Sequence, residues 1–317
     1  MGEYLVKRLL LAIPTVIGVV TLVFFAIHLA PGDPVALMIP PDLPAGIREE
    51  REAAIRARYG FDKPLHVQYL TYLGNIARLD LGRSLRTNAR IIDELPQRFL
   101  NTLQLGILAM MVSTTLGVTL GVISAVKRGT WIDNATMFGA LFGVSIPNFW
   151  FGLLLMLGVG LYWGVLPPSG FNGSILTWDG FRHAILPAVT LGTGSAAILA
   201  RFARSSVLDV IVQDYVRTAR AKGLAERVVV LRHVLKNALI PIITLLGLQF
   251  GAVLSGAVVT ETVFAWPGVG RYLITGINGR DFPVVQGTVI FIAIGFVLIN
   301  LITDLLYAYI DPRVRFR

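Results

Sequence analysis

Few residues in this chain have the types and spacing that covalent or metal chemistry requires. The 317 residues include no cysteine, which excludes disulfides, thiolate metal sites and cysteine nucleophiles. The dipeptide Gly-Lys is absent, so a Walker-type phosphate loop is excluded. The segment 143–147 resembles a serine nucleophile elbow but has a proline where the second glycine is required. The four histidines are scattered and never pair on one helix turn: His28, His66, His183 and His233. We therefore expect neither an enzyme nor a cofactor or metal site.

The other candidates are polar groups inside long apolar segments. Asp304 is the one acidic residue within such a segment, and an acid inside a membrane is a functional candidate, for example in proton coupling. Its closeness to Asp311 and the basic C-terminal residues favours instead an interfacial residue that pairs with an arginine or caps the bundle. The remaining candidates are uncharged and suit a wide translocation path: Ser145, Asn148, Thr244, Gln249 and Ser255.

The composition is that of a chain embedded in lipid. Hydrophobic residues make up 55% and charged residues 15%, and the mean hydropathy is +0.69. Soluble domains average about 45–50% apolar and about 25% charged residues. This excludes a disordered chain, a fibrous repeat and an ordinary soluble globule. The net charge of +9 raises the alternative of nucleic-acid binding, which the distribution of the charges disfavours.

Long stretches without charged residues predict the fold. A bilayer core about 30 Å thick requires about 20 residues of helix. The 45 uncharged residues between Asp133 and Asp179 include the turn-rich segment 167–170, so they hold one span and a loop. The first segment is too long for a signal peptide and is interpreted as a retained helix. The sequence thus predicts an all-α, polytopic membrane protein with six transmembrane helices, near 9–29, 101–126, 136–162, 183–203, 238–260 and 284–308.

The basic residues of the short loops predict the orientation. Most lie on one side of the membrane, in the N-terminal residues, at 127–128, in the loop 201–236 and in the C-terminal residues. Both termini are therefore expected in the cytoplasm, where anionic headgroups account for the positive charge. We expect the following division: 1–30, N-terminus and helix 1; 31–94, an extracytoplasmic region with an amphipathic helix at 45–58; 95–308, a compact unit of five helices with a cytoplasmic loop at 204–237; 309–317, a basic tail.

Small and cyclic residues mark packing sites. Glycines four residues apart, which allow close helix approach, occur at 117/121, 139/143, 160/164 and 247/251. The prolines at 14, 147, 187 and 241 either kink helices or mark their starts.

The loop between the fourth and fifth spans carries the most specific pattern. Asp214 is a good helix N-cap and Gly223 a good C′ residue, which predicts a helix over 215–222 with Arg217, Arg220 and Lys222 outward. So short a helix needs a surface to pack against. The residues alone leave open a loop at the membrane surface or a docking helix for a cytoplasmic partner.

This loop resembles the coupling loop of ATP-binding-cassette (ABC) importer permeases. The pattern reads Arg217-Thr218-Ala219 followed by Gly223, with Arg217 in place of the usual glutamate. Residues 214–223 resemble the peptide-permease branch almost residue for residue. Other segments similar to the first permease subunit of dipeptide and oligopeptide importers are 4–10, 28–34, 59–64, 68–69, 80–84, 166–170, 183–187, 261–270 and 309–313.

The resemblance implies a type I ABC importer permease fold in a bacterial or archaeal plasma membrane. It implies as partners a second, related permease subunit, two cytoplasmic ATPases, an extracytoplasmic binding protein and a peptide substrate. The coupling residues it implies are Asp214, Tyr215, Arg217, Ala219, Arg220, Ala221, Lys222 and Gly223. Nickel and glutathione importers share the architecture. An ion-gradient-driven transporter relying on Asp304 is the alternative from another class.

Overall fold

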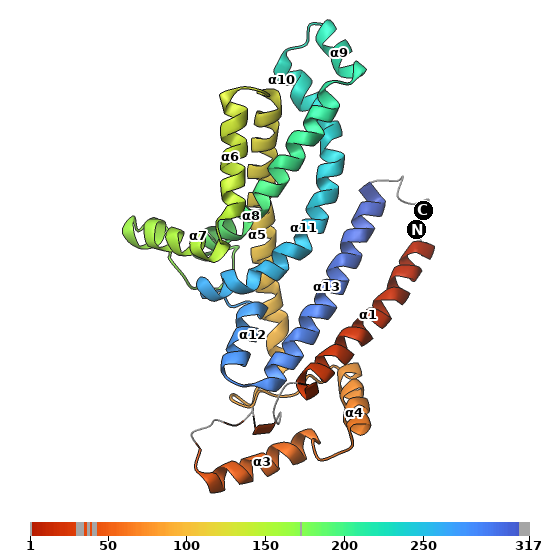
Figure 1. The fold of residues 1–317 in the computed structure, drawn as a ribbon, viewed down its shortest axis with the longest axis vertical. Helices are drawn as coiled ribbons and strands as arrows, with labels where there is room; N and C mark the ends of the chain where they lie inside the picture. Colours follow the sequence, from red (N-terminus) through yellow and green to blue (C-terminus); the bar gives the residue numbers. More distant parts are fainter. Residues whose placement is uncertain (1, 30–34, 37–38, 40–42, 172, 311–317) are drawn as a thin grey trace. The chain divides into compact units, whose positions relative to one another are not determined.

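The computed structural model describes residues 2–29, 35–36, 39, 43–171 and 173–310 (Figure 1). Nearly all of these residues are helical. Within them, extended pairing is confined to one isolated bridge between Arg83 and Arg90. The all-helical class predicted from the sequence is therefore confirmed. The chain divides into two units, one of residues 1–100 with 268–305 and one of residues 101–267 with 306–317.

The first unit contains α1 (Gly2–Leu29), α3 (Ala45–Tyr59), α4 (Leu65–Ala77), α12 (Val269–Asn278), the first residues of α5 (Ile91–Val126) and most of α13 (Phe282–Ile310). The amphipathic helix predicted at 45–58 is α3. It ends where Gly60 adopts a left-handed conformation with φ of 69°. A left-handed residue at this position is a common helix stop.

Polar and aromatic contacts fasten α4 to α1. The Thr21 and Tyr69 hydroxyls lie 2.7 Å apart, and His28 Nε2 lies 3.0 Å from Gln68 Oε1. The Phe24 ring packs edge-on against the Tyr69 ring, with centroids 5.3 Å apart. The region after helix 1 is therefore folded onto that helix rather than extended from it.

A buried carboxylate fixes the start of α13 within the same unit. Asp281 is 2% exposed and accepts hydrogen bonds from Ser84 Oγ at 2.5 Å and from the Leu85 backbone N–H at 3.1 Å. Around it lies a hydrophobic cluster of Ile91, Leu95, Val269 and Val284.

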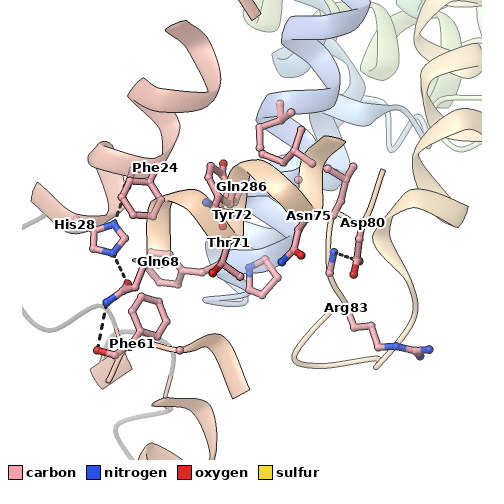
Figure 2. Close-up of a pocket in the computed structure, with 18 of the residues that line it drawn as sticks. Phe24, His28, Phe61, Gln68, Thr71, Tyr72, Asn75, Asp80, Arg83 and Gln286 are labelled. Atoms are coloured by element: carbon pink, nitrogen blue, oxygen red, sulfur yellow. Dashed lines mark hydrogen bonds between the residues drawn. The ribbon is translucent and has the colours of Figure 1, made fainter. Parts of the chain in front are cut away.

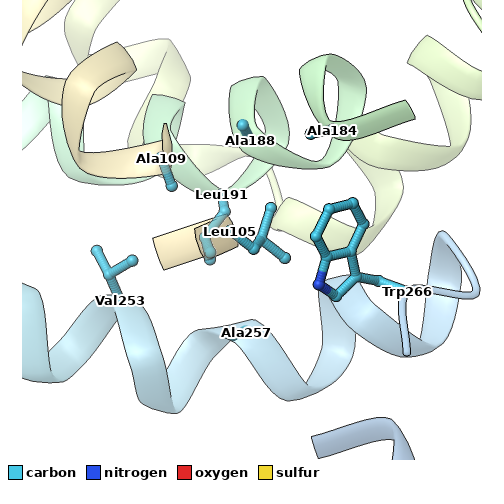
Figure 3. Close-up of a cluster of buried hydrophobic side chains, with 8 residues drawn as sticks. All are labelled: Leu105, Ala109, Ala184, Ala188, Leu191, Val253, Ala257 and Trp266. Atoms are coloured by element: carbon cyan, nitrogen blue, oxygen red, sulfur yellow. The ribbon is translucent and has the colours of Figure 1, made fainter. Parts of the chain in front are cut away.

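The second unit contains the rest of α5 together with α6 (Trp131–Ser145), α7 (Asn148–Leu155), the π-helix η1 (Met156–Tyr162), α8 (Trp178–Ile211), α9 (Asp214–Ala221), α10 (Glu226–Val228), the π-helix η2 (Val229–Val234) and α11 (Leu235–Val263). Trp266 is fully buried, and its indole N–H donates to the Asn101 carbonyl at 3.0 Å. Figure 3 shows it beside residues of α5, α8 and α11. The cluster comprises Leu105, Ala109, Ala184, Ala188, Leu191, Val253, Ala257 and Trp266.

Glycines bring α5 and α8 into close contact. A Cβ atom added at Gly117 would lie 2.8 Å from the Ala196 carbonyl oxygen, and one at Gly121 would lie 2.6 Å from that of Ala200. Of the predicted glycine pairs, 117/121 therefore does mediate helix approach. Gly139 has open space around its Cα, so the 139/143 pair does not. Gly192 of α8, which approaches the Ala109 carbonyl, was missed because it has no glycine partner at four-residue spacing.

Within the described residues, four helices are long and apolar enough to cross a membrane, namely Ile91–Val126, Trp178–Ile211, Glu226–Val263 and Phe282–Leu301. A bent pair formed by Trp131–Ser145 and Asn148–Tyr162 makes a fifth if counted as one span, and Leu10–Ala26 is a shorter apolar helix. The total of six spans remains a prediction.

The single span predicted over 136–162 is wrong as a continuous helix. The chain bends by 101° between α6 and the segment formed by α7 and η1. Pro147 causes the break, since a proline disfavours the helical conformation of the preceding residue. Ile146 is accordingly extended, with φ of −84° and ψ of 126°. Of the four prolines noted in the sequence, Pro147 thus marks a helix start, while Pro14, Pro187 and Pro241 lie inside helices.

Candidate functional site

The loop helix predicted from the sequence is α9, and it lies with α10 beyond the ends of α8 and α11 (Figure 1). The predicted N-cap is wrong by one residue: Gln213 is the N-cap, and Asp214 lies in the first turn. An acidic residue there still interacts favourably with the helix dipole. Gly223 has the predicted left-handed conformation, with φ of 75°.

The inner face of α9 packs on the rest of the loop. Val216 and Ala219 are buried and belong to a cluster that includes Val207 of α8, Val229 and Val234 of η2, Ala125 and Ala238. Ala219 was expected among the partner-contacting residues. Its side chain faces this cluster and holds the helix in place instead.

Polar contacts fasten both flanks of α9. On one side, Arg220 forms a bidentate ion pair with Glu226, with nitrogen–oxygen distances of 3.1 and 2.7 Å. This pairing raises the pKa of Arg220 above its ordinary value. On the other side, Asn237 Nδ2 donates to the Tyr215 hydroxyl at 3.0 Å. The ion pair with α10 and the hydrogen bond with α11 therefore hold in place an eight-residue helix that would not be stable alone.

The outer face of α9 is left to solvent. At 100° per residue, Asp214, Arg217, Thr218 and Ala221 lie opposite Val216 and Ala219, and all four are exposed. Arg217 and Asp214 are 3.7 Å apart, with side chains 73% and 97% exposed, so their ion pair contributes little. Thr218 and Ala221 are small, and so they permit close approach of another surface.

A second ion pair ties α6 to α8 near this loop. Arg204 Nε and Nη2 each donate to the Asp133 carboxylate at 2.9 Å. Asp133 also accepts from Ser124 Oγ and, at 3.0 Å, from the Gly129 backbone N–H. Four donors on three segments thus converge on one buried carboxylate. The sequence did not predict this structural role of Asp133, because Arg204 lies far from it along the chain.

The Asp133→Ala variant is expected to destabilise the fold by about 2–3 kcal/mol, because it leaves partly buried donors unpaired. Asp133→Asn keeps an acceptor oxygen and should cost less. The matched control is Asp93→Ala, whose partner Arg90 is 3.9 Å away in an exposed pair; it should change stability by less than about 0.5 kcal/mol. Unfolding in mixed detergent micelles measures these values. Equal stability of the two alanine variants would contradict the structural role.

Comparison with known proteins decides the family. Residues 117–316 match the family described as "Binding-protein-dependent transport system inner membrane component", and residues 1–106 match its N-terminal region. The dipeptide transport system permease protein DppB of Escherichia coli K12 is 42% identical over 339 residues, covering 99% of both chains. The glutathione transport system permease protein GsiC of Salmonella typhimurium LT2 is 43% identical over 317 residues, covering 100% of both chains.

This chain belongs to that family of transport permeases. A solved structure of an inward-facing methionine ABC transporter, MetNI, matches with a TM-score of 0.56 at 19% identity, over 69% of this chain and 96% of that one. At this identity the likeness shows the fold alone. The resemblance stated from the sequence is confirmed, and the permease is a member of the ABC importer family rather than of an enzyme family.

The permease places the candidate path residues in two groups. Thr244 and Ser255 are eleven residues apart, about three helical turns, and lie on one exposed face of α11. Gln249 is buried on the other side of that helix, and its amide nitrogen has no hydrogen-bond partner in the described part of the chain. Ser145 and Asn148 flank the bend at Pro147, and Asn148 lies against Gly194 of α8.

Among the described residues of the permease, each unit contains a cavity. The cavity in the second unit has a volume of about 390 Å³ and lies between α8 and α11, with Thr244 on its wall. The cavity in the first unit, about 410 Å³, is shown in Figure 2. It is lined by groups from α1, α3, α4 and α13, including Phe24, Tyr72 and Gln286. None of the candidate coupling or path residues lines it, whereas His28 and residues of the segments 59–64, 68–69 and 80–84, which carry the family resemblance, do. Burial raises the pKa of the Tyr72 phenol above its ordinary value, and Gln286 partly offsets the shift.

One buried acid of the permease was missed by sequence reasoning. Glu261 is 0% exposed, and Thr102 Oγ1 donates to its Oε1 at 2.5 Å. The signal available was its position at the end of a long apolar segment, where an acid requires a partner. The side chain of Asp304, the acid that was singled out, lies outside the described residues.

Proposed function

We propose that this chain is a permease subunit of an ATP-driven importer of short peptides and couples to a cytoplasmic ATPase through α9. The observation that carries the proposal is the presentation of α9: a fixed helix with an exposed outer face at the end of the bundle. The two relatives transport dipeptides and glutathione according to their names, and both solutes are short peptides.

The proposed assembly contains a second, related permease subunit, two ATPases and an extracytoplasmic binding protein, in the plasma membrane of a bacterium. Both termini lie in the cytoplasm, in line with the basic residues of the short loops. The division into helix 1, the extracytoplasmic region 31–94, the permease domain 95–308 with its loop 204–237, and the tail belongs to the same proposal.

The packing supplies a route by which a movement of α9 reaches the bundle. The inner face of α9 contacts α8 and η2, and its flanks are bonded to α10 and α11. α8 in turn is in close contact with α5 through Gly121 and is tied to α6 through Arg204. Closure of the ATPases on ATP would therefore move these helices together and shift the equilibrium between two access states.

The exposed face of α11 is proposed as part of the translocation path. Between Ile240 and Val259 its exposed residues include Thr244 and Ser255 and no charged side chain. A neutral path imposes no charge preference on the side chains of a passing peptide, which suits varied peptides. Ser145, Asn148 and Gln249 remain candidates for the same path in another state of the transporter.

Purification of the tagged chain from mild detergent, with mass spectrometry of the accompanying proteins, tests this proposal. The expected result is recovery of a related permease and of ATPases that carry phosphate-binding loops. A chain that purifies alone and moves solute in liposomes without ATP would overturn it. In that case Asp304→Asn would be expected to stop transport, because an ion-driven mechanism requires that acid.

A further inference from the structure

The end of the cytoplasmic loop carries positive charge that the loop does not neutralise. From Asp214 to Arg227 there are four basic and two acidic residues. Arg220 and Glu226 neutralise each other in the bidentate pair. Asp214 offsets Arg217 only weakly across 3.7 Å of solvent-exposed space. Lys222 and Arg227 are exposed, and neither forms an ion pair with another described residue.

These charges lie on α9 and on the segment that directly follows it. Arg217 lies on the outer face of α9, Lys222 directly follows the helix and Arg227 lies in α10 next to the Arg220–Glu226 pair. At the centre are the small side chain of Ala221 and the carboxylate of Asp214, with Thr218 beside them. We call Arg217, Lys222 and Arg227 the cationic rim. The arrangement is a shallow, close-approach surface with positive groups at its edge.

The length of the helical segment that carries Arg227 argues that this end of the cationic rim lies beyond the lipid headgroups. The continuous helical segment Glu226–Val263 has 38 residues, far more than the roughly 20 that a bilayer core requires, so its first turns project beyond the bilayer. Arg227 precedes Lys236 by nine residues, or about 13 Å of helix. This exceeds the Debye length of about 8 Å at physiological ionic strength. Arg232 and Lys236, which adjoin the apolar segment, are the residues placed for headgroup contact.

We infer that the cationic rim selects an ATPase whose docking groove is bordered by carboxylates. The inference rests on the proposed function and adds the chemistry of the partner surface. Complementary charge at the edge of an interface accelerates association and disfavours wrong partners, while contributing less to affinity than the central contacts. The rim thereby decides which ATPase docks on this subunit rather than on its related partner.

Charge reversal tests the inference in nanodiscs of neutral lipid, with binding of the purified ATPases measured at low and at physiological salt. The rim variant combines Arg217→Glu, Lys222→Glu and Arg227→Glu, and the matched control combines Arg232→Glu and Lys236→Glu. We expect the rim variant to bind about 10- to 100-fold more weakly at low salt and to lose the salt dependence shown by the unmodified chain. The control should bind as the unmodified chain does.

The outcomes separate this inference from the proposed function. Unchanged binding of the rim variant, or an equal loss in the control, would overturn the acidic groove and leave ATPase docking intact. A loss that appears only in anionic nanodiscs would assign the rim to lipid headgroups and would also overturn it. Failure of the unmodified chain to bind any ATPase would overturn the proposed function itself. If carboxylates of the ATPase groove are changed to lysine and the rim variant then binds that ATPase again, the result would further support the inference.

Discussion

The Ala221→Trp variant is expected to fold and insert normally but to lose almost all ATP-dependent uptake. Ala221 lies on the outer face of α9, opposite the buried Val216 and Ala219, so the indole projects into solvent in the free chain. In the assembled transporter it would have to fit between α9 and the ATPase. Overpacking of a close interface costs about 1–3 kcal/mol, which weakens association about 5- to 150-fold.

Uptake of labelled dipeptide into proteoliposomes, together with co-purification of the ATPases, measures this effect. The matched control is Leu231→Trp, which changes an exposed apolar residue of η2 in the same loop and leaves the sequence of α9 unchanged. Thr218→Trp should behave as Ala221→Trp does. Normal uptake by both α9 variants would show that the outer face of α9 is not a docking surface.

The Trp266→Ala variant is expected to lose about 3–5 kcal/mol of stability, the largest effect of any single substitution considered for this chain. Trp266 is the largest fully buried side chain, and its ring lies 4.1 Å from that of Phe171, centroid to centroid. Its removal leaves a cavity where α5, α8 and the end of α11 meet. Because lipid is itself apolar, most of the loss comes from lost contacts rather than from contact with water.

A graded series separates packing from hydrogen bonding at this position. Trp266→Phe keeps an aromatic ring but removes the donor to the Asn101 carbonyl, so we expect a loss of about 1–2 kcal/mol. Trp131→Ala, at a side chain that is 77% exposed, serves as the control for loss of a tryptophan. The fraction of monodisperse protein left after heating in detergent ranks the variants. Equal survival of Trp266→Ala and Trp131→Ala would contradict the central packing role.

The helices and their approximate limits could be predicted from local sequence, because a membrane helix must satisfy its backbone internally and cover itself with apolar side chains. The helix α3 and the left-handed conformation of Gly223 were predicted correctly because they also depend on local sequence. It also explains the error over 136–162: hydropathy is unbroken there, whereas Pro147 changes the backbone of a single preceding residue. A hydropathy average over many residues does not register a change in the backbone conformation of one residue.

The sequence predicted where the candidate site lies along the chain, but not which of its residues face outward and which hold the helix in place. A helix between Asp214 and Gly223 follows from capping residues and from the resemblance, but three of its polar or small residues proved to hold it in place. Ala219 packs inward, Arg220 pairs with Glu226 and Tyr215 bonds to Asn237. These roles depend on what lies beside the helix, which no local pattern records.

The sequence by itself determined the family, the helical class and the place of the loop helix α9, since these depend on composition, charge distribution and short motifs. Only the tertiary structure decided which residues face outward on α9, that the face of α11 with Thr244 and Ser255 is exposed while Gln249 is buried, and that Asp133 pairs with Arg204. The physical reason is distance along the chain. Local patterns fix backbone conformation, whereas pairing between segments tens of residues apart is fixed by the packing of whole helices.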